Sequence, residues 1–165
     1  NLTKYYRDKF NLNCYNAILF NTESYYRAKE YLIPKICLAA IKAKKFKRKT
    51  MFGNLNISRE WNWCEEQCDY LIKFLNNKPQ DFILSNGKNY SAYQMINFAF
   101  KYFNLNYKKF VITKKQLFRK KDFLNKISNF QSDLKKNKLR RRPKVYGKSL
   151  VINLIKFYVK KKCIK

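Results

Sequence analysis

The stretch Phe52–Trp63, FGNLNISREWNW, differs in composition from the rest of the chain. It holds one of only three glycines, followed by small polar residues and then an Arg-Glu-Trp sequence. The flanking sequence is dominated by Lys, Asn, Ile, Phe and Tyr. Because Gly with small polar neighbours is typical of loops, the passage predicts a loop, of a kind more usual in a soluble enzyme than in a very basic protein.

The charge of the chain is its most unusual property. Its 165 residues include 38 Lys+Arg and 10 Asp+Glu, which gives a formal net charge of +28, while 46% of the residues are hydrophobic. That apolar content is enough for one domain with a core. So many positive charges on one chain repel one another unless a polyanion such as RNA, DNA or an anionic membrane neutralises them. We therefore expect a nucleic-acid-associated chain, with a merely solvated basic surface as the alternative.

Several classes of site and location are disfavoured by composition. The sequence has no run of 18 apolar residues, so no membrane span is predicted. No signal peptide or presequence is visible at the N-terminus, which begins with Asn rather than Met. The Lys/Asn/Ile/Phe/Tyr bias is what AT-rich codons encode and suggests an organelle, here the mitochondrial matrix. Histidine is absent. The five cysteines predict free thiols in a reducing compartment and no metal site. They are Cys14, Cys37, Cys64, Cys68 and Cys163. We also expect no cofactor.

The apolar pattern predicts short strands alternating with helices, an α/β arrangement. Strands are expected at 14–20, where the run is buried, at 81–85 and at 109–113. A first helix is expected over 26–44, with a kink or a late start at Pro34. The last segment carries an apolar stripe typical of a helix, formed by Leu150, Val151, Leu154, Ile155, Tyr158 and Val159.

Two further helices have more specific signatures. Ser91 with Gln94 three residues later predicts a capping box, and the helix that follows should bury Met95, Ile96, Ala99 and Phe103. A helix over 65–76 should bury Cys68, Leu71, Ile72 and Leu75, which lie on one face at helical spacing.

Five stretches in order resemble the C-terminal part of GDP-mannose 4,6-dehydratase, an extended short-chain dehydrogenase/reductase. They are YYRDKFNLNCYNAILFNTES (5–24), FGNLNISREW (52–61), NNKPQDFILSNGKNYSAYQMINFAF (76–100), LFRKKD (117–122) and RRRPKV (140–145). The order and spacing hold from about residue 3 to 160. The resemblance implies one degenerate domain over 1–165 with a partial fold: the last Rossmann strand and helices plus the substrate-binding subdomain, with the first Rossmann half missing.

The resemblance also implies which positions faced a nucleotide sugar. Asn21, Lys35 and Arg59 match substrate-side residues of the family, and Arg119 and Asp122 stand where the family holds the nucleotide. Guanidinium groups suit phosphate and ribose oxygens. In the 52–63 stretch, Gly53 is then expected to form the turn and Trp61 to anchor the packing.

Departures from the family predict a chain that is not an enzyme. The glycine-rich dinucleotide loop and the Tyr-x-x-x-Lys set of the family fall upstream of Asn1. Tyr5 and Lys9 have the right spacing but lie after the position of the family's pair. Thr22 and Trp63 replace two family histidines. Hydride transfer needs a bound dinucleotide and a positioned acid/base, so we expect a pseudoenzyme fragment.

The main hypothesis from sequence is a non-catalytic structural protein of a mitochondrial ribosome that binds rRNA and neighbouring ribosomal proteins. Its basic segments are 42–50, 114–121, 135–144 and 160–165, and Lys and Arg there would neutralise phosphates. The residues expected to contact RNA are Lys44, Lys45, Lys47, Arg48, Lys49, Lys120, Lys121, Lys135, Lys136, Lys138, Arg140, Arg141, Arg142, Lys144, Lys160, Lys161 and Lys162.

Two alternatives remain open. The chain could be the substrate-binding half of a split or truncated GDP-mannose 4,6-dehydratase, or an accessory scaffold subunit of a respiratory complex. All three hypotheses share one demand. In the family the 14–20 stretch is a strand of the dinucleotide-binding sheet, so its edge needs a cover: an upstream segment, a second chain or a ribosomal neighbour.

Overall fold

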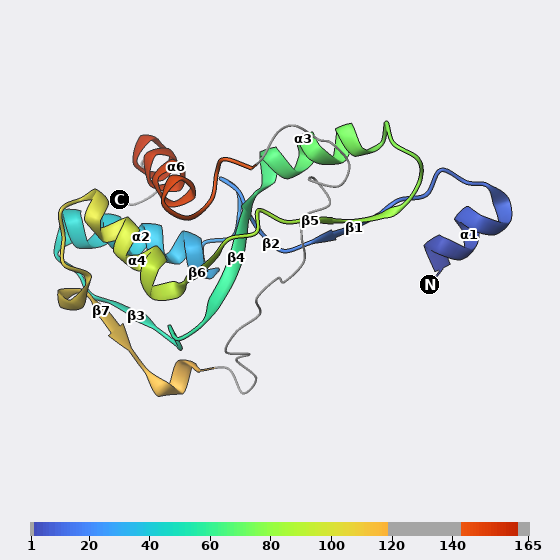
Figure 1. Ribbon diagram of the computed structural model, residues 1–165. Coiled ribbons are helices and arrows are strands. Elements are labelled where there is room, and N and C mark those ends of the chain that lie inside the picture. Colours follow the sequence, from blue (N-terminus) through green and yellow to red (C-terminus); the bar gives the residue numbers. More distant parts are fainter. Residues whose placement is uncertain (1, 119–142, 162–165) are drawn as a thin grey trace.

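A computed structural model describes residues 2–118 and 143–161 of the chain. Helices and short strands alternate along them (Figure 1), which confirms the predicted α/β class. The elements are α1 (Leu2–Phe10), β1 (Asn16–Leu19), β2 (Asn21–Glu23), α2 (Leu32–Phe46), β3 (Thr50–Phe52), β4 (Ser58–Trp63), α3 (Cys64–Phe74), β5 (Asp81–Leu84), β6 (Asn89–Ser91), α4 (Ala92–Tyr102), η1 (Tyr107–Lys109), β7 (Val111–Thr113), η2 (Lys115–Leu117) and α6 (Gly147–Lys160).

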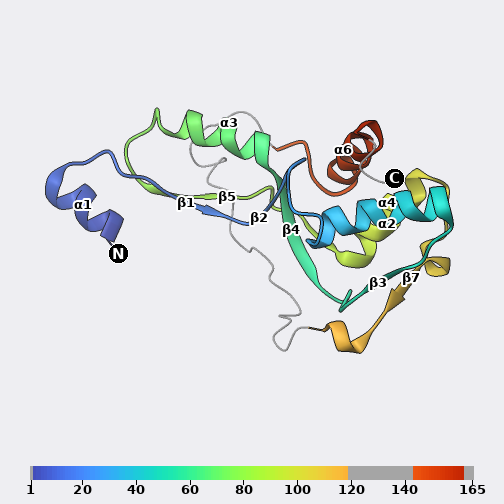
Figure 2. The ribbon, with the colours of Figure 1, turned by 180° about the vertical axis from the view of Figure 1, so that it is seen from behind.

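The main core lies where α2, α4 and α6 pack against one another at one end of the molecule (Figures 1 and 2). Ile36, Ile96 and Leu154, one from each helix, are completely buried there. Burial of such a side chain contributes roughly 1.5–3 kcal/mol. The three helices therefore form the stable part of the described structure and fix the elements attached to them.

Two helix starts follow from local chemistry. Helix α2 begins at Leu32, so Pro34 falls in its first turn, where its missing N–H costs no intrahelical hydrogen bond. The late start predicted from Pro34 is thus the correct one. Helix α4 has the predicted capping box, because the Ser91 side chain accepts from the Gln94 N–H and the Gln94 side chain accepts from the Ser91 N–H.

The strands form small, mostly parallel sheets that connect distant parts of the chain. β1 pairs with β5, β2 with β4, and β3 with β7, all parallel, while β4 pairs with β6 in antiparallel fashion. The prediction that residues 52–63 form only a loop was wrong in its second half, since β4 begins at Ser58. Trp61 and Trp63 are buried on one face of β4, and Glu60 and Asn62 are buried on the other, so the second half of the strand is covered on both faces and shows no alternating pattern.

The predicted strand at 14–20 was correct in type but wrong in burial. It is divided into β1 and the start of β2, and in β1 the side chains of Ile18 and Leu19 are 53% and 44% exposed. Helix α1, which precedes β1 and projects from the molecule (Figure 1), has no buried residue. Arg7 ties α1 to the sheet by donating to the Cys14 carbonyl and to the Asp81 carboxylate.

Helix α3 presents a different face to the protein from the one predicted. Tyr70 and Phe74 are buried, whereas Cys68, Ile72 and Leu75 are exposed. The Phe74 ring stacks on Phe82 of β5, with the ring centres 3.5 Å apart. Aromatic packing on the β1–β5 sheet therefore decides the orientation of α3, rather than its aliphatic stripe.

No helix within the described ranges combines the length and apolarity required to cross a lipid bilayer.

Candidate functional site

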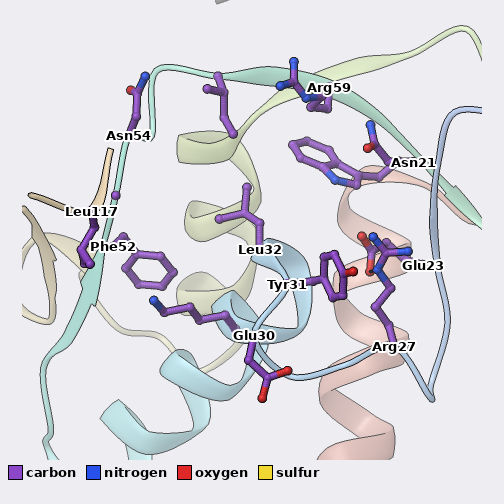
Figure 3. A pocket seen from close by; sticks show the side chains of 14 residues that line it. Asn21, Glu23, Arg27, Glu30, Tyr31, Leu32, Phe52, Asn54, Arg59 and Leu117 are labelled. Carbon is purple, nitrogen blue, oxygen red and sulfur yellow. Dashed lines mark ion pairs between the residues drawn. The ribbon is translucent and has the colours of Figure 1, made fainter. Parts of the chain in front are cut away.

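A cavity of about 280 Å³ opens between β2, the loop that follows it, the start of α2 and the β3–β4 segment (Figure 3). Polar and charged side chains from these separate elements converge on it. Its lining residues are Asn21, Glu23, Arg27, Glu30, Tyr31, Leu32, Lys35, Phe52, Gly53, Asn54, Ile57, Arg59, Trp61 and Leu117. A concave site with a few convergent polar groups is the usual form of a small-ligand site.

Three cations and two carboxylates line the cavity. Arg27 lies on the loop after β2, Lys35 in the first turns of α2, and Arg59 in β4. Glu23 ends β2, and Glu30 lies on the loop. The balance favours an anionic ligand, because basic side chains outnumber acidic ones and both guanidinium groups can bind an oxyanion bidentately.

Aromatic rings position two of the cations. The Arg27 guanidinium lies 3.9 Å from the centre of the Tyr31 ring, and Lys35 Nζ lies 5.0 Å from the centre of the Phe52 ring. Cation–π attraction of this kind contributes about 0.5–2 kcal/mol. Both charges are therefore held on the cavity side of their elements without being neutralised by the rings.

Gly53 lies at a bend directly after β3, where a turn was predicted, and its lack of a side chain has a second role. A Cβ at this position would lie 2.4 Å from the Leu117 carbonyl oxygen, so only glycine permits the close approach of η2 to the end of β3. Leu117 lines the cavity together with Gly53. The glycine thus closes one side of the site.

Behind the cavity, Glu60 holds β4 to the segment after β5. Its carboxylate accepts from Ser85 Oγ at 2.8 Å, from the Asn86 N–H at 2.7 Å and from Asn62 Nδ2 at 3.0 Å. Its carbonyl accepts from Asn21 Nδ2 at 3.1 Å. This network positions Asn21 and β4, which contribute to the wall of the site, and it was not foreseen from sequence.

Glu23 is the unusual titratable group of the site. Its side chain is only 3% exposed and its nearest opposite charge is Arg27, with 3.7 Å between Arg27 Nε and Glu23 Oε2. Burial raises the pKa of the Glu23 carboxyl to about 7, and the Arg27 charge offsets part of that increase. Neither Glu23 Oε2 nor Arg27 Nε has a hydrogen-bond partner among the described residues.

The structure brings three of the five predicted sugar-nucleotide positions together. Asn21, Lys35 and Arg59 all line the cavity, and Trp61, predicted as a packing anchor, is 4% exposed at its wall. Arg119 and Asp122 lie outside the described residues. The binding roles of these five residues stay predictions.

Sequence reasoning missed Glu23, Arg27, Glu30 and Tyr31, which line the same cavity. The one available signal was the spacing of Glu23 and Arg27, an acid and a base four residues apart directly after a strand.

The residues predicted to bind RNA do not gather at this cavity. Lys44, Lys45, Lys47, Arg48 and Lys49 are exposed at the end of α2 and just after it, and Lys160 and Lys161 are exposed at the end of α6. Lys144 is also exposed, and its N–H donates to the Glu66 carboxylate. The remainder lie outside the described residues: Lys120, Lys121, Lys135, Lys136, Lys138, Arg140, Arg141, Arg142 and Lys162.

Tyr5 and Lys9 do interact, since Lys9 Nζ donates to Tyr5 Oη at 2.7 Å. Both residues lie on α1, which extends away from the cavity (Figure 2). The pair therefore cannot serve as acid and base at this site.

Within residues 2–118 and 143–161, no group of three or more Cys, Asp or Glu side chains is arranged to hold a metal ion. Cys14, Cys37, Cys64 and Cys68 are free thiols. Burial raises the pKa of the Cys37 thiol, and the nearby Glu23 charge adds to the increase.

Solved structures of low sequence identity show which fold the chain has. The dTDP-glucose 4,6-dehydratase of Bacillus anthracis, in complex with NAD, superposes with a TM-score of 0.79 over 98% of this chain and 49% of that one, at 15% identity. RMD from Pseudomonas aeruginosa, complexed with NADPH, gives a TM-score of 0.80 over 97% of this chain and 53% of that one, at 10% identity. The chain thus has part of the extended short-chain dehydrogenase/reductase fold.

Sequence comparison identifies the family within that class. The family model for GDP-mannose 4,6 dehydratase matches residues 1–147, and the chain belongs to this family. GDP-mannose 4,6 dehydratase 2 of Arabidopsis thaliana is 29% identical over 135 residues, which is 81% of this chain and 35% of that protein. GDP-mannose 4,6 dehydratase 1 of the same plant is 29% identical over 150 residues, 88% of this chain and 40% of that protein. The chain thus spans two fifths or less of these relatives.

The predicted ribosomal function was wrong. The family model and the relatives reported above are dehydratases, and none of them is a ribosomal or RNA-binding protein. The error has a physical basis. Net charge is evidence about solubility and association, and it does not show to which family a protein belongs. In addition, the same codon bias that enriches Asn and Ile also enriches Lys. The mitochondrial location rested on that bias too, has no support from the comparisons and stays a prediction.

Proposed function

We propose that this chain is the substrate-binding part of a GDP-mannose 4,6-dehydratase-type enzyme and that its cavity binds a GDP-hexose. The observation that carries the proposal is the convergence of Asn21, Lys35 and Arg59 on one cavity. These are the three described positions that match substrate-side residues of the family. Their amide, ammonium and guanidinium groups suit the oxygens of a diphosphate.

We infer further that the chain does not catalyse dehydration by itself. Hydride transfer needs a dinucleotide site and a positioned acid/base, and the Tyr5–Lys9 pair lies on α1, away from the cavity. The complete reaction would need a complementary dinucleotide-binding part, supplied by a longer form of this chain or by a second chain.

The β1 edge supports the need for such a complement. Among the described residues, β1 and β5 form a sheet of two parallel strands, with Ile18 and Leu19 largely exposed. Parallel strands are normally buried on both faces in larger sheets. On α1, directly before β1, Tyr5, Tyr6 and Phe10 are between 42% and 52% exposed. We propose that the complementary part covers this apolar surface.

Direct binding measurements test the substrate assignment. The full chain, fused to a tryptophan-free solubility carrier, is titrated with GDP-mannose while the fluorescence of Trp61 at the cavity wall is recorded. We expect saturable quenching, with weaker binding of UDP-glucose. The Arg59→Ala variant should bind GDP-mannose about 10- to 100-fold more weakly, because a charge-assisted hydrogen bond contributes about 1.5–3 kcal/mol.

A matched control separates this effect from overall charge. Arg48→Ala removes one positive charge from the exposed segment after α2, where the Arg48 guanidinium lies 5.6 Å from the centre of the Phe46 ring and outside the cavity. It should change the affinity less than twofold. Equal losses in the two variants, or no binding of GDP-mannose by the unsubstituted chain, would refute the proposed function.

A further inference from the structure

The end of β2 and the loop that follows it bring together a carboxylate and a guanidinium that are too far apart to form a hydrogen bond. Glu23 is buried, while the Arg27 side chain is 31% exposed and lines the cavity. The 3.7 Å between Arg27 Nε and Glu23 Oε2 is too long for a hydrogen bond. Figure 3 shows the two side chains next to each other at the end of the cavity opposite Phe52 and Leu117. An ionised carboxylate in this position gains charge attraction but no hydrogen bond, which is unfavourable for a buried charge.

Arg27 is also shared with the cavity. Its guanidinium is held over the Tyr31 ring, which neither neutralises it nor occupies its N–H donors. A phosphoryl group in the cavity would compete with the Glu23 carboxylate for the positive charge of Arg27, and the competition would disappear once Glu23 became neutral.

We propose that Arg27 is a phosphoryl-binding residue of this cavity and that protonation of Glu23 makes it available, so that binding of an anionic ligand is coupled to uptake of a proton. The inference rests on the proposed function for the identity of the ligand, but it concerns a pair of residues to which the family resemblance assigned no role.

The surroundings of Glu23 leave Arg27 as its main electrostatic partner. Within the described ranges, Arg27 is the one cation within ion-pair distance of Glu23. The Cys37 thiol of α2 is neutral, because burial raises its pKa. The other titratable or charged groups on the loop and on the elements that line the cavity or pack around it are Tyr25, Tyr26, Lys29, Glu30 and Tyr31 of the loop, Lys35, Lys42, Lys44 and Lys45 of α2, Arg59 and Glu60 of β4, Lys115 of η2, and Lys148, Lys156, Tyr158 and Lys160 of α6, whose Phe157 stacks on Tyr25.

The direction of the pH effect follows from linkage. Anion binding prefers protonated Glu23, so affinity is highest below the carboxyl pKa of the free protein, about 7, and falls as the pH rises above it. If one proton is taken up per ligand, affinity at pH 8 should be about tenfold lower than at pH 6.

The test is the pH dependence of GDP-mannose affinity in the full chain on its soluble carrier. GDP-mannose is a suitable probe, because its doubly substituted pyrophosphate has no group of pKa near 6 such as a terminal phosphate has. We expect the unsubstituted chain to lose about tenfold in affinity between pH 6 and 8. Glu23→Gln should bind at every pH about as tightly as the unsubstituted chain does at pH 6.

Two further variants give the test its specificity. Arg27→Gln should bind more weakly at pH 6 and lose the pH dependence, because the shared cation is gone. Glu30→Gln also removes a negative charge from the cavity but should keep the pH dependence, since Glu30 is not paired with Arg27 in the described structure.

The possible results separate the two proposals. A flat pH profile in the unsubstituted chain would overturn this inference alone, even if Glu23→Gln failed to fold. A Glu23→Gln variant with an undiminished pH slope would do the same. If GDP-mannose did not bind at any pH, both this inference and the proposed function would fail.

Discussion

Replacement of Glu60 by alanine should reveal how strongly the wall of the cavity depends on one buried carboxylate. Glu60 is 2% exposed and accepts hydrogen bonds from Asn62, Ser85 and the Asn86 N–H. Alanine would leave three donors without their acceptor in a part of the protein that water barely reaches. Each buried unpaired donor costs about 1–3 kcal/mol, and removal of one side of a buried charged network typically costs about 3–5 kcal/mol.

We therefore expect Glu60→Ala to lower the free energy of unfolding by about 3–5 kcal/mol, a large share of the 5–15 kcal/mol typical of a domain. Glu60→Gln keeps the shape and one acceptor, so it should lose about half as much. The two tryptophans of the chain, Trp61 and Trp63, flank this site in β4 and provide the probe. Urea unfolding of the carrier-fused chain, followed by their fluorescence, gives the midpoint and slope.

The control for this measurement is Glu30→Ala. Glu30 is exposed at the mouth of the cavity, and a surface change of this kind should alter the free energy of unfolding by less than about 0.5 kcal/mol. If Glu60→Ala lowered the free energy of unfolding by no more than this control, the three donors would not depend on the Glu60 carboxylate as their acceptor. That result would refute the expected role of Glu60.

Three more changes have defined outcomes. Gly147→Ala should lower the free energy of unfolding by about 2 kcal/mol or more in the same urea assay, because the position has φ +52° and a Cβ would lie 2.5 Å from the Tyr90 ring; an unchanged midpoint would contradict this. Ser91→Ala removes the cap of α4 and should cost about 1 kcal/mol, whereas the exposed Ser149→Thr retains a hydroxyl and should cost less. The chain without a carrier or complement should aggregate through β1 and α1; a monodisperse monomer in low salt, seen by light scattering, would count against the uncovered edge.

Local signals in the sequence were sufficient where short-range chemistry determines the structure. The Ser91–Gln94 box and the late start at Pro34 follow from bonds within one turn of a helix, so they can be recognised without any tertiary information. The family resemblance likewise predicts that Asn21, Lys35 and Arg59 face one ligand, and all three line the same cavity.

The sequence failed where long-range packing decides. In α3 the aliphatic stripe with Ile72 and Leu75 suggested the inner face, but stacking of Phe74 on Phe82 turns that stripe toward solvent. β4 was missed because burial on both faces removes the alternating pattern by which a strand is usually recognised. Glu23 was missed because its burial depends on elements far away along the chain.

The parallel pairing of the strands has a consequence for the way this polypeptide is made. Asn16 and Asp81, paired across β1 and β5, are 65 residues apart, and the β2–β4 and β3–β7 pairs also close long segments. Long-range parallel pairing makes folding slow, because loop closure must precede the gain from contacts. During synthesis, β1 therefore waits for its partner until α3 and then β5 have been made. A very basic nascent chain with exposed β1 during that interval is a natural client for chaperones, whatever later covers its edge.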